Sequence, residues 1–223
     1  QLDHLPLYAA SDEFPCDDVP GHITEGELAV ARSMLAVNAK ASDVRVLDLG
    51  AAVVFEDKFN HMVKHTRSKA ATSFTFVAGH LQAIWQKFGR HEPVVVVDRQ
   101  SGRMRYRELR ATTFEGATLR ILEESPQVSA YHIEQRSRDT KRAMTIRFEV
   151  EADAEHMPVA LASMVSKYTR ELLMQRFNNW FTARCPHIKP TAGYATDAKR
   201  FWREIEPMLG KLAIEPGMLR RMS

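Results

Sequence analysis

The sequence predicts an α/β protein in which helices flank a mixed β-sheet. Apolar residues recur at helical spacing in several long segments, which predicts amphipathic helices. Four consecutive valines at 94–97 are typical of a strand that is covered on both faces. Three further strand-like segments follow before two last helices, and this order favours a mixed sheet covered by helices in one domain over residues 24–223.

Size and composition exclude several classes of protein. The chain has 223 residues, of which 44% are hydrophobic and 26% charged, and this excludes a disordered, collagen-like or membrane-embedded chain. The formal net charge is only +3, so binding of a polyanion would require local clusters of basic residues. Two cysteines, Cys16 and Cys185, form no disulfide framework and indicate a reducing compartment. Because no secretory signal is evident either, we expect a cytoplasmic protein with no membrane partner.

The first elements follow from capping and spacing. Residues 1–23 are rich in Pro and Asp and predict an irregular lead-in. Thr24 and Glu27 fit a capping box, so a helix is expected over about 25–39. The Val- and Leu-rich stretch 44–54 predicts a strand or paired strands.

Apolar residues at helical spacing then predict a helix within 59–88, and Gly89 suits a left-handed stop. Strands are expected at 94–98, 118–122, 128–134 and 143–150, the last two joined by a charged turn at 136–141. Pro158 fits the first turn of a long helix to about Ala183, and a final helix is expected over 196–212.

Asp98 directly follows the valine strand. In an open α/β sheet, ligands collect outside the carboxyl ends of the strands, and a carboxylate there is placed by rigid backbone. The alternative is an Asp that starts a turn, because Arg99-Gln100-Ser101-Gly102 is good turn sequence. Position alone does not decide between the two.

A second candidate lies on the long helix. Ser163, Lys167 and Glu171 are spaced four apart and share one helical face. A hydroxyl, an ammonium and a carboxylate in line could hold a phosphate and a metal ion. The alternative is a solvated stripe with one Lys-Glu pair, which is the commoner meaning of such spacing.

The surrounding sequence resembles a known family. The segment Asp153–Met174 is similar, without a gap, to the part of type 2 ribonucleases H that runs from Gly-Asp-Ala through Ala-Ser-Ile-x-Ala-Lys-x-x-Arg-Asp. Four further segments resemble elements of that family in the same order, and together the matches cover about residues 50–223. They are Phe55–Asn60 (Glu-Ile-Asp-x-Leu-Asn), Val94–Asp98 (Val-Asp-Gly), Thr191–Thr196 (Gly-Tyr-x-Thr) and Leu219–Ser223 (His-Arg-x-Ser-Phe).

The resemblance implies a ribonuclease H-like domain that cleaves RNA in RNA/DNA hybrids with four carboxylates and two divalent metal ions. Asp98 matches the third carboxylate and Glu171 the fourth, where Glu resembles the type 3 branch. Mg²⁺ or Mn²⁺ is the expected cofactor, since all-oxygen ligands suit these ions. Ser163 and Lys167 would order the phosphate, and Tyr194 matches the tyrosine that stacks at the RNA–DNA junction.

The chain departs from the family at two points. No Asp-Glu-x-Gly-x-Gly element, which holds the first two carboxylates, is present, and Asp12-Glu13 and Asp17-Asp18 are expected to be loop acids. Because the chain begins with Gln1 rather than Met, we expect this element upstream of Gln1, or else a relative with an incomplete site. Arg99 replaces the glycine that follows the strand aspartate.

Basic residues cluster just after Asp98, and we expect a monomer that binds an RNA/DNA hybrid or duplex there. Arg99 and Arg103 are the expected substrate contacts of this cluster, which also includes Arg105, Arg107 and Arg110. The sequence leaves two alternatives open. One is a nucleic-acid-binding protein of the same fold without catalysis, and the other is a nuclease on a different structured nucleic acid.

Overall fold

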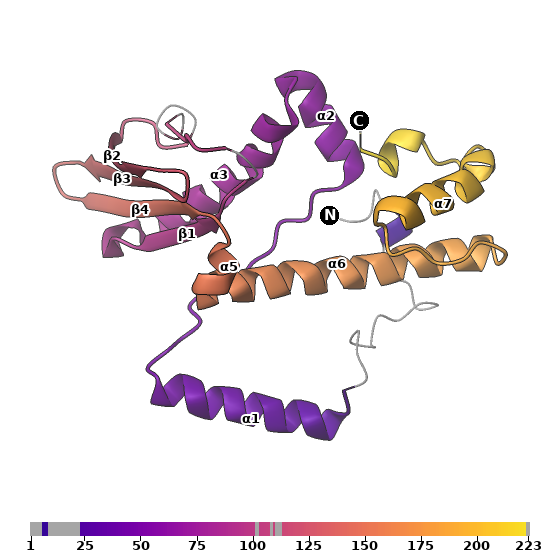
Figure 1. The fold of residues 1–223 in the computed structure, drawn as a ribbon, viewed down its shortest axis with the longest axis horizontal. Helices are drawn as coiled ribbons and strands as arrows, with labels where there is room; N and C mark the ends of the chain where they lie inside the picture. Colours follow the sequence, from indigo (N-terminus) through magenta and orange to yellow (C-terminus); the bar gives the residue numbers. More distant parts are fainter. Residues whose placement is uncertain (1–5, 9–22, 101–102, 108, 110–112, 222–223) are drawn as a thin grey trace. The chain divides into compact units, whose positions relative to one another are not determined.

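A computed structural model of the chain describes residues 6–8, 23–100, 103–107, 109 and 113–221 (Figure 1). It confirms the mixed α/β class. Contacts group the chain into two compact units, residues 54–164 with 217–223 and residues 1–53 with 165–216. The organisation as one domain over 24–223 stays a prediction.

A four-stranded sheet forms the first of these units. Its order is β1-β4-β3-β2, with β1 (Val94–Asp98) parallel to β4 (Lys141–Glu149). The strands β2 (Thr118–Glu124), β3 (Val128–Arg136) and β4 form an antiparallel meander. The amide of Ser137 donates to the carbonyl of Thr140 at 2.8 Å and closes the β3–β4 turn. All four strand predictions over 94–150 are thus confirmed, with ends shifted by a few residues.

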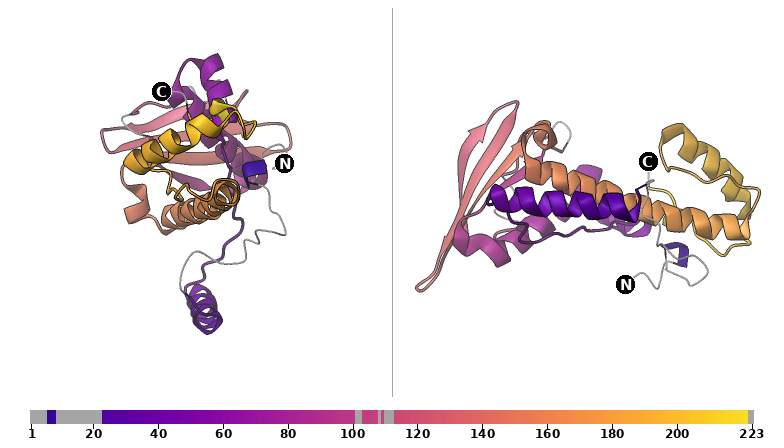
Figure 2. Two further views of the ribbon diagram at one scale, coloured as in Figure 1. Left: turned by 90° about the vertical axis from the view of Figure 1, so that its right-hand side faces the viewer. Right: turned by 90° about the horizontal axis from the view of Figure 1, so that it is seen from below.

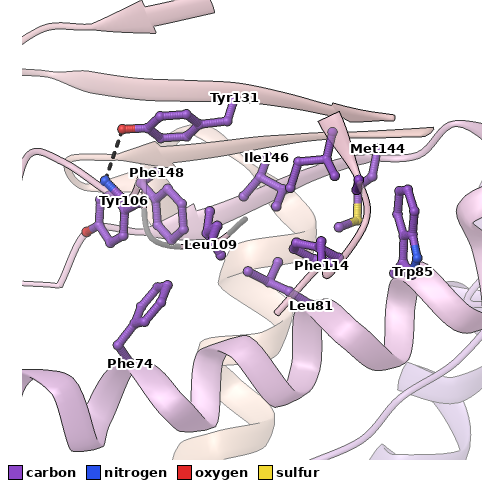
Figure 3. Close-up of a cluster of buried hydrophobic side chains, with 12 residues drawn as sticks. Phe74, Leu81, Trp85, Tyr106, Leu109, Phe114, Tyr131, Met144, Ile146 and Phe148 are labelled. Atoms are coloured by element: carbon purple, nitrogen blue, oxygen red, sulfur yellow. Dashed lines mark hydrogen bonds between the residues drawn. The ribbon is translucent and has the colours of Figure 1, made fainter. Parts of the chain in front are cut away.

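Helix α3 (Lys69–Phe88) covers one face of the sheet (Figures 1 and 2). The buried cluster between them is drawn in Figure 3, and its aromatic centre is a stacked pair, Tyr106 and Phe148, with ring centroids 3.6 Å apart. Such ring pairs add to the stabilisation from burial alone. The cluster contains Phe74, Leu81, Trp85, Tyr106, Leu109, Phe114, Ala117, Tyr131, Ile133, Met144, Ile146 and Phe148.

A polar chain continues from this core to the surface. The amide of Tyr106 donates to the Tyr131 hydroxyl at 3.0 Å (Figure 3). That hydroxyl donates to Glu124 at 2.6 Å. Arg107 pairs with the same carboxylate. The hydrogen bonds from Arg107 and Tyr131 lower the pKa of Glu124 to about 2, and burial together with the bond to Glu124 raises the pKa of Tyr131 to about 12.

The valine strand is only partly covered, which corrects the prediction of a strand covered on both faces. Val95 and Val97 pack against the core, whereas Val94 is 65% exposed. Val95 and Val97 lie on the face covered by α3, while Val96 on the opposite face is half-buried. Consecutive β-branched residues favour a strand but do not fix how many of its faces are covered.

Residues 44–55 form no strand, so the prediction of a strand or paired strands at 44–54 is wrong. They have no regular secondary structure, and Val46, Leu47 and Leu49 are exposed. A strand requires a neighbour for its hydrogen bonds, and among the described residues the sheet consists of four other segments. A high content of Val and Leu is therefore not sufficient to predict a strand.

The helical stretch within 59–88 is two helices rather than one. Helix α2 (Glu56–Thr66) ends at Arg67, whose φ of 52° is left-handed, and Ser68 then caps α3 by accepting from the amide of Ala71 at 3.2 Å. The left-handed stop expected at Gly89 is also wrong. Gly89 is right-handed and opens the 3₁₀ turn Gly89–His91, and Glu92 takes the left-handed conformation instead.

The other unit is helical. Aromatic rings join α6 (Met157–Arg184), whose residues from 165 onward belong to this unit, to α7 (Ala195–Ile205), which lies beside it in Figure 2. Phe177, Phe181 and Phe201 meet with centroids 4.8–5.5 Å apart. The start of α6 confirms the role of Pro158. However, α7 ends at Ile205 rather than near 212, because Pro207 lies in a following 3₁₀ turn.

Helix α1 (Glu25–Ala41) has the predicted capping box. The Thr24 hydroxyl accepts from the amide of Glu27 at 3.3 Å, while the Glu27 carboxylate accepts from the Thr24 amide at 2.8 Å. No residue of this helix is buried. Over the described ranges of the chain, none of the helices has the length and apolarity needed to span a bilayer.

We expect Phe148→Ala to destabilise the sheet unit by about 3–5 kcal/mol, since it removes the ring stacked on Tyr106 and leaves a cavity. Val94→Ala, on the exposed edge strand, serves as the control and should cost less than about 1 kcal/mol. Urea unfolding followed by circular dichroism measures both. Equal losses in the two variants would contradict this account of the core.

Candidate functional site

Asp98 lies at the carboxyl end of β1, as the sequence predicts, and its side chain is exposed. One carboxylate oxygen, Oδ1, accepts from the amide of Ala152 at 3.2 Å. Ala152 is the first residue of the short helix α5 (Ala152–Glu155), at the start of the segment that precedes α6. The strand end and this segment therefore meet at the Asp98 carboxylate.

Glu149 lies beside Asp98, and the sequence analysis missed it. The two residues are register partners on adjacent parallel strands, so their side chains leave the sheet on the same face. The Glu149 carboxylate accepts from Arg147 and lies 2.8 Å from Nε2 of His156. Burial raises its pKa, but the hydrogen bonds from Arg147 and His156 prevail and lower it, so Glu149 is ionised at neutral pH.

Two of the predicted substrate contacts, Arg99 and Arg103, are engaged within the protein. The Arg99 guanidinium donates to the carbonyls of Ser125 and Pro126 and to the Ser129 hydroxyl, which ties the end of β1 to the turn before β3. The Arg103 guanidinium stacks on Phe74 and Tyr106, 4.2 and 4.8 Å from the ring centroids. Their role as substrate contacts stays a prediction.

The remaining arginines of this cluster differ from one another. Arg107 pairs with Glu124, Arg105 is exposed, and Arg110 lies outside the described residues. The cluster that suggests a nucleic-acid surface in the sequence thus includes several cations that stabilise the sheet unit.

Ser163, Lys167 and Glu171 all lie on the uninterrupted helix α6, which confirms their helical spacing. Ser163 is half-buried, while Lys167 and Glu171 are exposed. Glu171 pairs with the neighbouring Arg170 at 2.7 Å. Asp98 belongs to the sheet unit and Glu171 to the helical unit.

Tyr194 forms an exposed platform with Arg170. The guanidinium carbon of Arg170 lies 3.9 Å from the centroid of the Tyr194 ring, and the ring residue remains 58% exposed. Arg170 also donates to the carbonyl of Ala192. Gly193 has a φ of +73°, and a Cβ at this position would lie 3.0 Å from the guanidinium, so a larger residue would displace it.

The loop before α7 is held by Asp197. Its Oδ2 accepts from the Thr191 hydroxyl at 2.6 Å and from the amide of Ala192 at 2.7 Å, and its Oδ1 pairs with Arg200 at 2.7 Å. These bonds, led by the one from Thr191, lower the pKa of Asp197 from 3.8 to about 2. The loop that carries Tyr194 is therefore anchored at the first turn of α7.

Asn60 joins two segments that resemble the ribonuclease H elements, although the sequence analysis gave it no role of its own. It is only 7% exposed, and its amide group donates to the carbonyls of Gly217 and Arg220 at 3.0 and 2.8 Å. Arg221 stacks on Phe59, 4.6 Å from the ring centroid. The final residues Met222 and Ser223 lie outside the described part of the chain.

The carboxylates that could hold a metal ion are few. Within the described part of the chain, no group of three or more His, Cys, Asp or Glu side chains is arranged to hold a metal ion. Asp98 and Glu171 supply the hard oxygen ligands that Mg²⁺ or Mn²⁺ prefers, but a two-metal site needs more carboxylates than these. The expected cofactor therefore stays a prediction.

Comparison with protein-family models, curated proteins and solved structures finds no match for this chain.

The depressed pKa of Asp197 gives a testable pH dependence. Its ionised form is stabilised only in the folded protein, so this stabilisation is complete above about pH 4 and is lost as the pH falls toward 2. Asp197→Asn should flatten the decline in thermal stability over this window, measured by circular dichroism. Asp139→Asn, in the exposed β3–β4 turn, is the control and should keep the wild-type decline.

Proposed function

We propose that the chain is a ribonuclease H-like endonuclease that cleaves RNA phosphodiesters in RNA/DNA hybrids or duplexes. One observation carries this proposal. Several segments that resemble the family lie far apart in the sequence. In the structure they contact one another in pairs, each pair within one unit.

Two such pairs are present, and a third contact lies directly beside a matched segment. The end of the Val94–Asp98 element meets the segment leading into Asp153–Met174 through the Asp98–Ala152 hydrogen bond. The Phe55–Asn60 element meets the closing element through Asn60 and the carbonyl of Arg220. The Asp153–Met174 segment meets Thr191–Thr196 through Arg170 and Tyr194. These contacts support the proposal, because the elements of one site must lie close together in the fold.

The proposed roles follow from the chemistry of each side chain. A metal-ligand role is assigned to Asp98 of the sheet unit and, separately, to Glu171 of the helical unit. Bound Mg²⁺ or Mn²⁺ ions would supply an activated water and stabilise the leaving oxygen. Lys167, an exposed cation one turn from Glu171, contacts the phosphate, and the Ser163 hydroxyl orders it. The exposed ring of Tyr194 stacks on the nucleic acid.

The edge of β1 offers a place for the two further carboxylates. Thr145 donates to the carbonyl of Pro93 and Arg99 to that of Glu149, so odd-numbered residues of this strand bond to β4. In a parallel ladder the alternate residues then direct their backbone groups to the other side, which here is the sheet edge. A strand that carries two acids and pairs with this edge would place them beside Asp98.

A nucleic-acid-binding protein of the same fold without catalysis is the second candidate. It is favoured by Arg99, which replaces the family glycine next to Asp98 and ties the strand end to the 125–129 segment. A nuclease on another structured nucleic acid is a third candidate. A cytoplasmic location and a monomeric state stay predictions, and the buried free thiol of Cys185 fits a reducing compartment.

Cleavage of a labelled RNA/DNA hybrid by the full-length gene product in Mg²⁺ or Mn²⁺ tests the proposal. We expect Asp98→Asn to lower the cleavage rate by about a hundredfold or more, because it removes a charged metal ligand. Asp139→Asn makes the same chemical change in the exposed β3–β4 turn and should leave the rate unchanged.

Equal rates for wild type and Asp98→Asn would remove Asp98 from the mechanism. Hybrid binding that weakens with salt, without any hydrolysis, would instead favour the second candidate. Hydrolysis of a DNA junction or a structured RNA, with no action on the hybrid, would favour the third.

A further inference from the structure

The guanidinium of Arg170 is engaged on three sides. Its central carbon lies 3.9 Å from the centroid of the Tyr194 ring. One nitrogen donates to the Glu171 carboxylate at 2.7 Å, and another donates to the carbonyl of Ala192. All four residues belong to the helical unit. One planar cation thus contacts the stacking ring, the backbone beside it and the carboxylate assigned to the metal ion.

The loop that carries Tyr194 does not depend on Arg170 for its shape. Asn178 exchanges two hydrogen bonds of 2.9 Å with the backbone of Thr191. Asp197 independently fixes Thr191 and Ala192. The contact between Arg170 and the ring is therefore additional to the bonds that hold the loop.

We infer that Arg170 is a positioning residue that holds the Tyr194 ring for stacking on a nucleobase and couples this ring to Glu171. The inference rests on the proposed function and extends it to a residue that the sequence analysis did not assign. One side of the ring is covered by the guanidinium, while the residue keeps 58% of its surface exposed to a ligand. The positive charge of Arg170 also lies where a base that stacks on the ring brings its phosphate.

Lysine cannot replace arginine in this arrangement. A planar guanidinium can stack on a ring and donate along its edges at the same time, whereas an ammonium group is a compact, strongly hydrated charge. Arg170→Lys therefore keeps the charge and removes the positioning. Arg203→Lys, at an exposed position on α7, is the matched control.

Fluorescence anisotropy with a labelled RNA/DNA hybrid, in EDTA to prevent cleavage, measures the effect. Stacking of a base on an aromatic ring is strong enough that Tyr194→Leu should weaken binding by roughly tenfold or more. We expect Arg170→Lys to weaken it by about threefold to tenfold, as a cation–π contact of this kind would. The double variant should bind no more weakly than Tyr194→Leu alone, because the two residues act together.

A measurement on the free protein separates the positioning of the Tyr194 ring from the binding of nucleic acid. Arg170→Lys should shift the NMR resonances of the Tyr194 ring while leaving the thermal midpoint unchanged, and Arg203→Lys should change neither. If the wild-type protein binds the hybrid and Arg170→Lys binds it as tightly as Arg203→Lys does, the inference about Arg170 is overturned while the proposed function stands. Additive losses of affinity in the double variant would also overturn the inference about Arg170. Failure of the wild-type protein to bind any hybrid would overturn the proposed function and the ligand assigned to Tyr194.

Discussion

The parallel pairing of β1 with β4 is the constraint on which the sheet unit depends. It places Val95 and Val97 beside Ile146 and Phe148 on the face covered by α3, so that one register builds both the sheet and its core. The same register brings Asp98 next to Glu149 at the carboxyl ends of the strands. Because the ladder is made of backbone hydrogen bonds, the carboxylates are positioned by rigid main chain rather than by flexible loops.

Arginine side chains join separate segments in both units. Arg99 ties the end of β1 to the turn before β3, Arg103 covers aromatic rings of the core, and Arg170 links α6 to the loop before α7. A guanidinium is weakly hydrated, planar and rich in donors, so it can stack and donate at once. A cluster of arginines in a sequence therefore does not by itself indicate a surface for nucleic acid, since several of them are held by the protein.

Local signals made much of the fold predictable. The capping box at Thr24, Pro158 in a first helical turn and the β-branched strands all act through neighbouring residues, and the elements that they predict are present. The failures concern tertiary structure. Residues 44–54 lack a neighbouring strand, β1 is only partly covered, and the break at Arg67 depends on one residue with positive φ. Composition and periodicity do not specify partners that are distant in the sequence.

The candidate site shows the same difference between local signals and contacts with distant segments. Asp98 could be predicted, because a carboxylate after a valine strand has a defined place in a sheet. Glu149, Asn60 and Arg170 could not be assigned from the sequence, since each lies in the candidate site through a distant segment. Glu149 is the register partner of Asp98, Arg170 contacts Tyr194, and Asn60 bonds to residues 157 and 160 positions away. Asn60 and Arg170 each join two of the segments on which the resemblance was based. The proposed function therefore rests on short sequence motifs together with these two contacts.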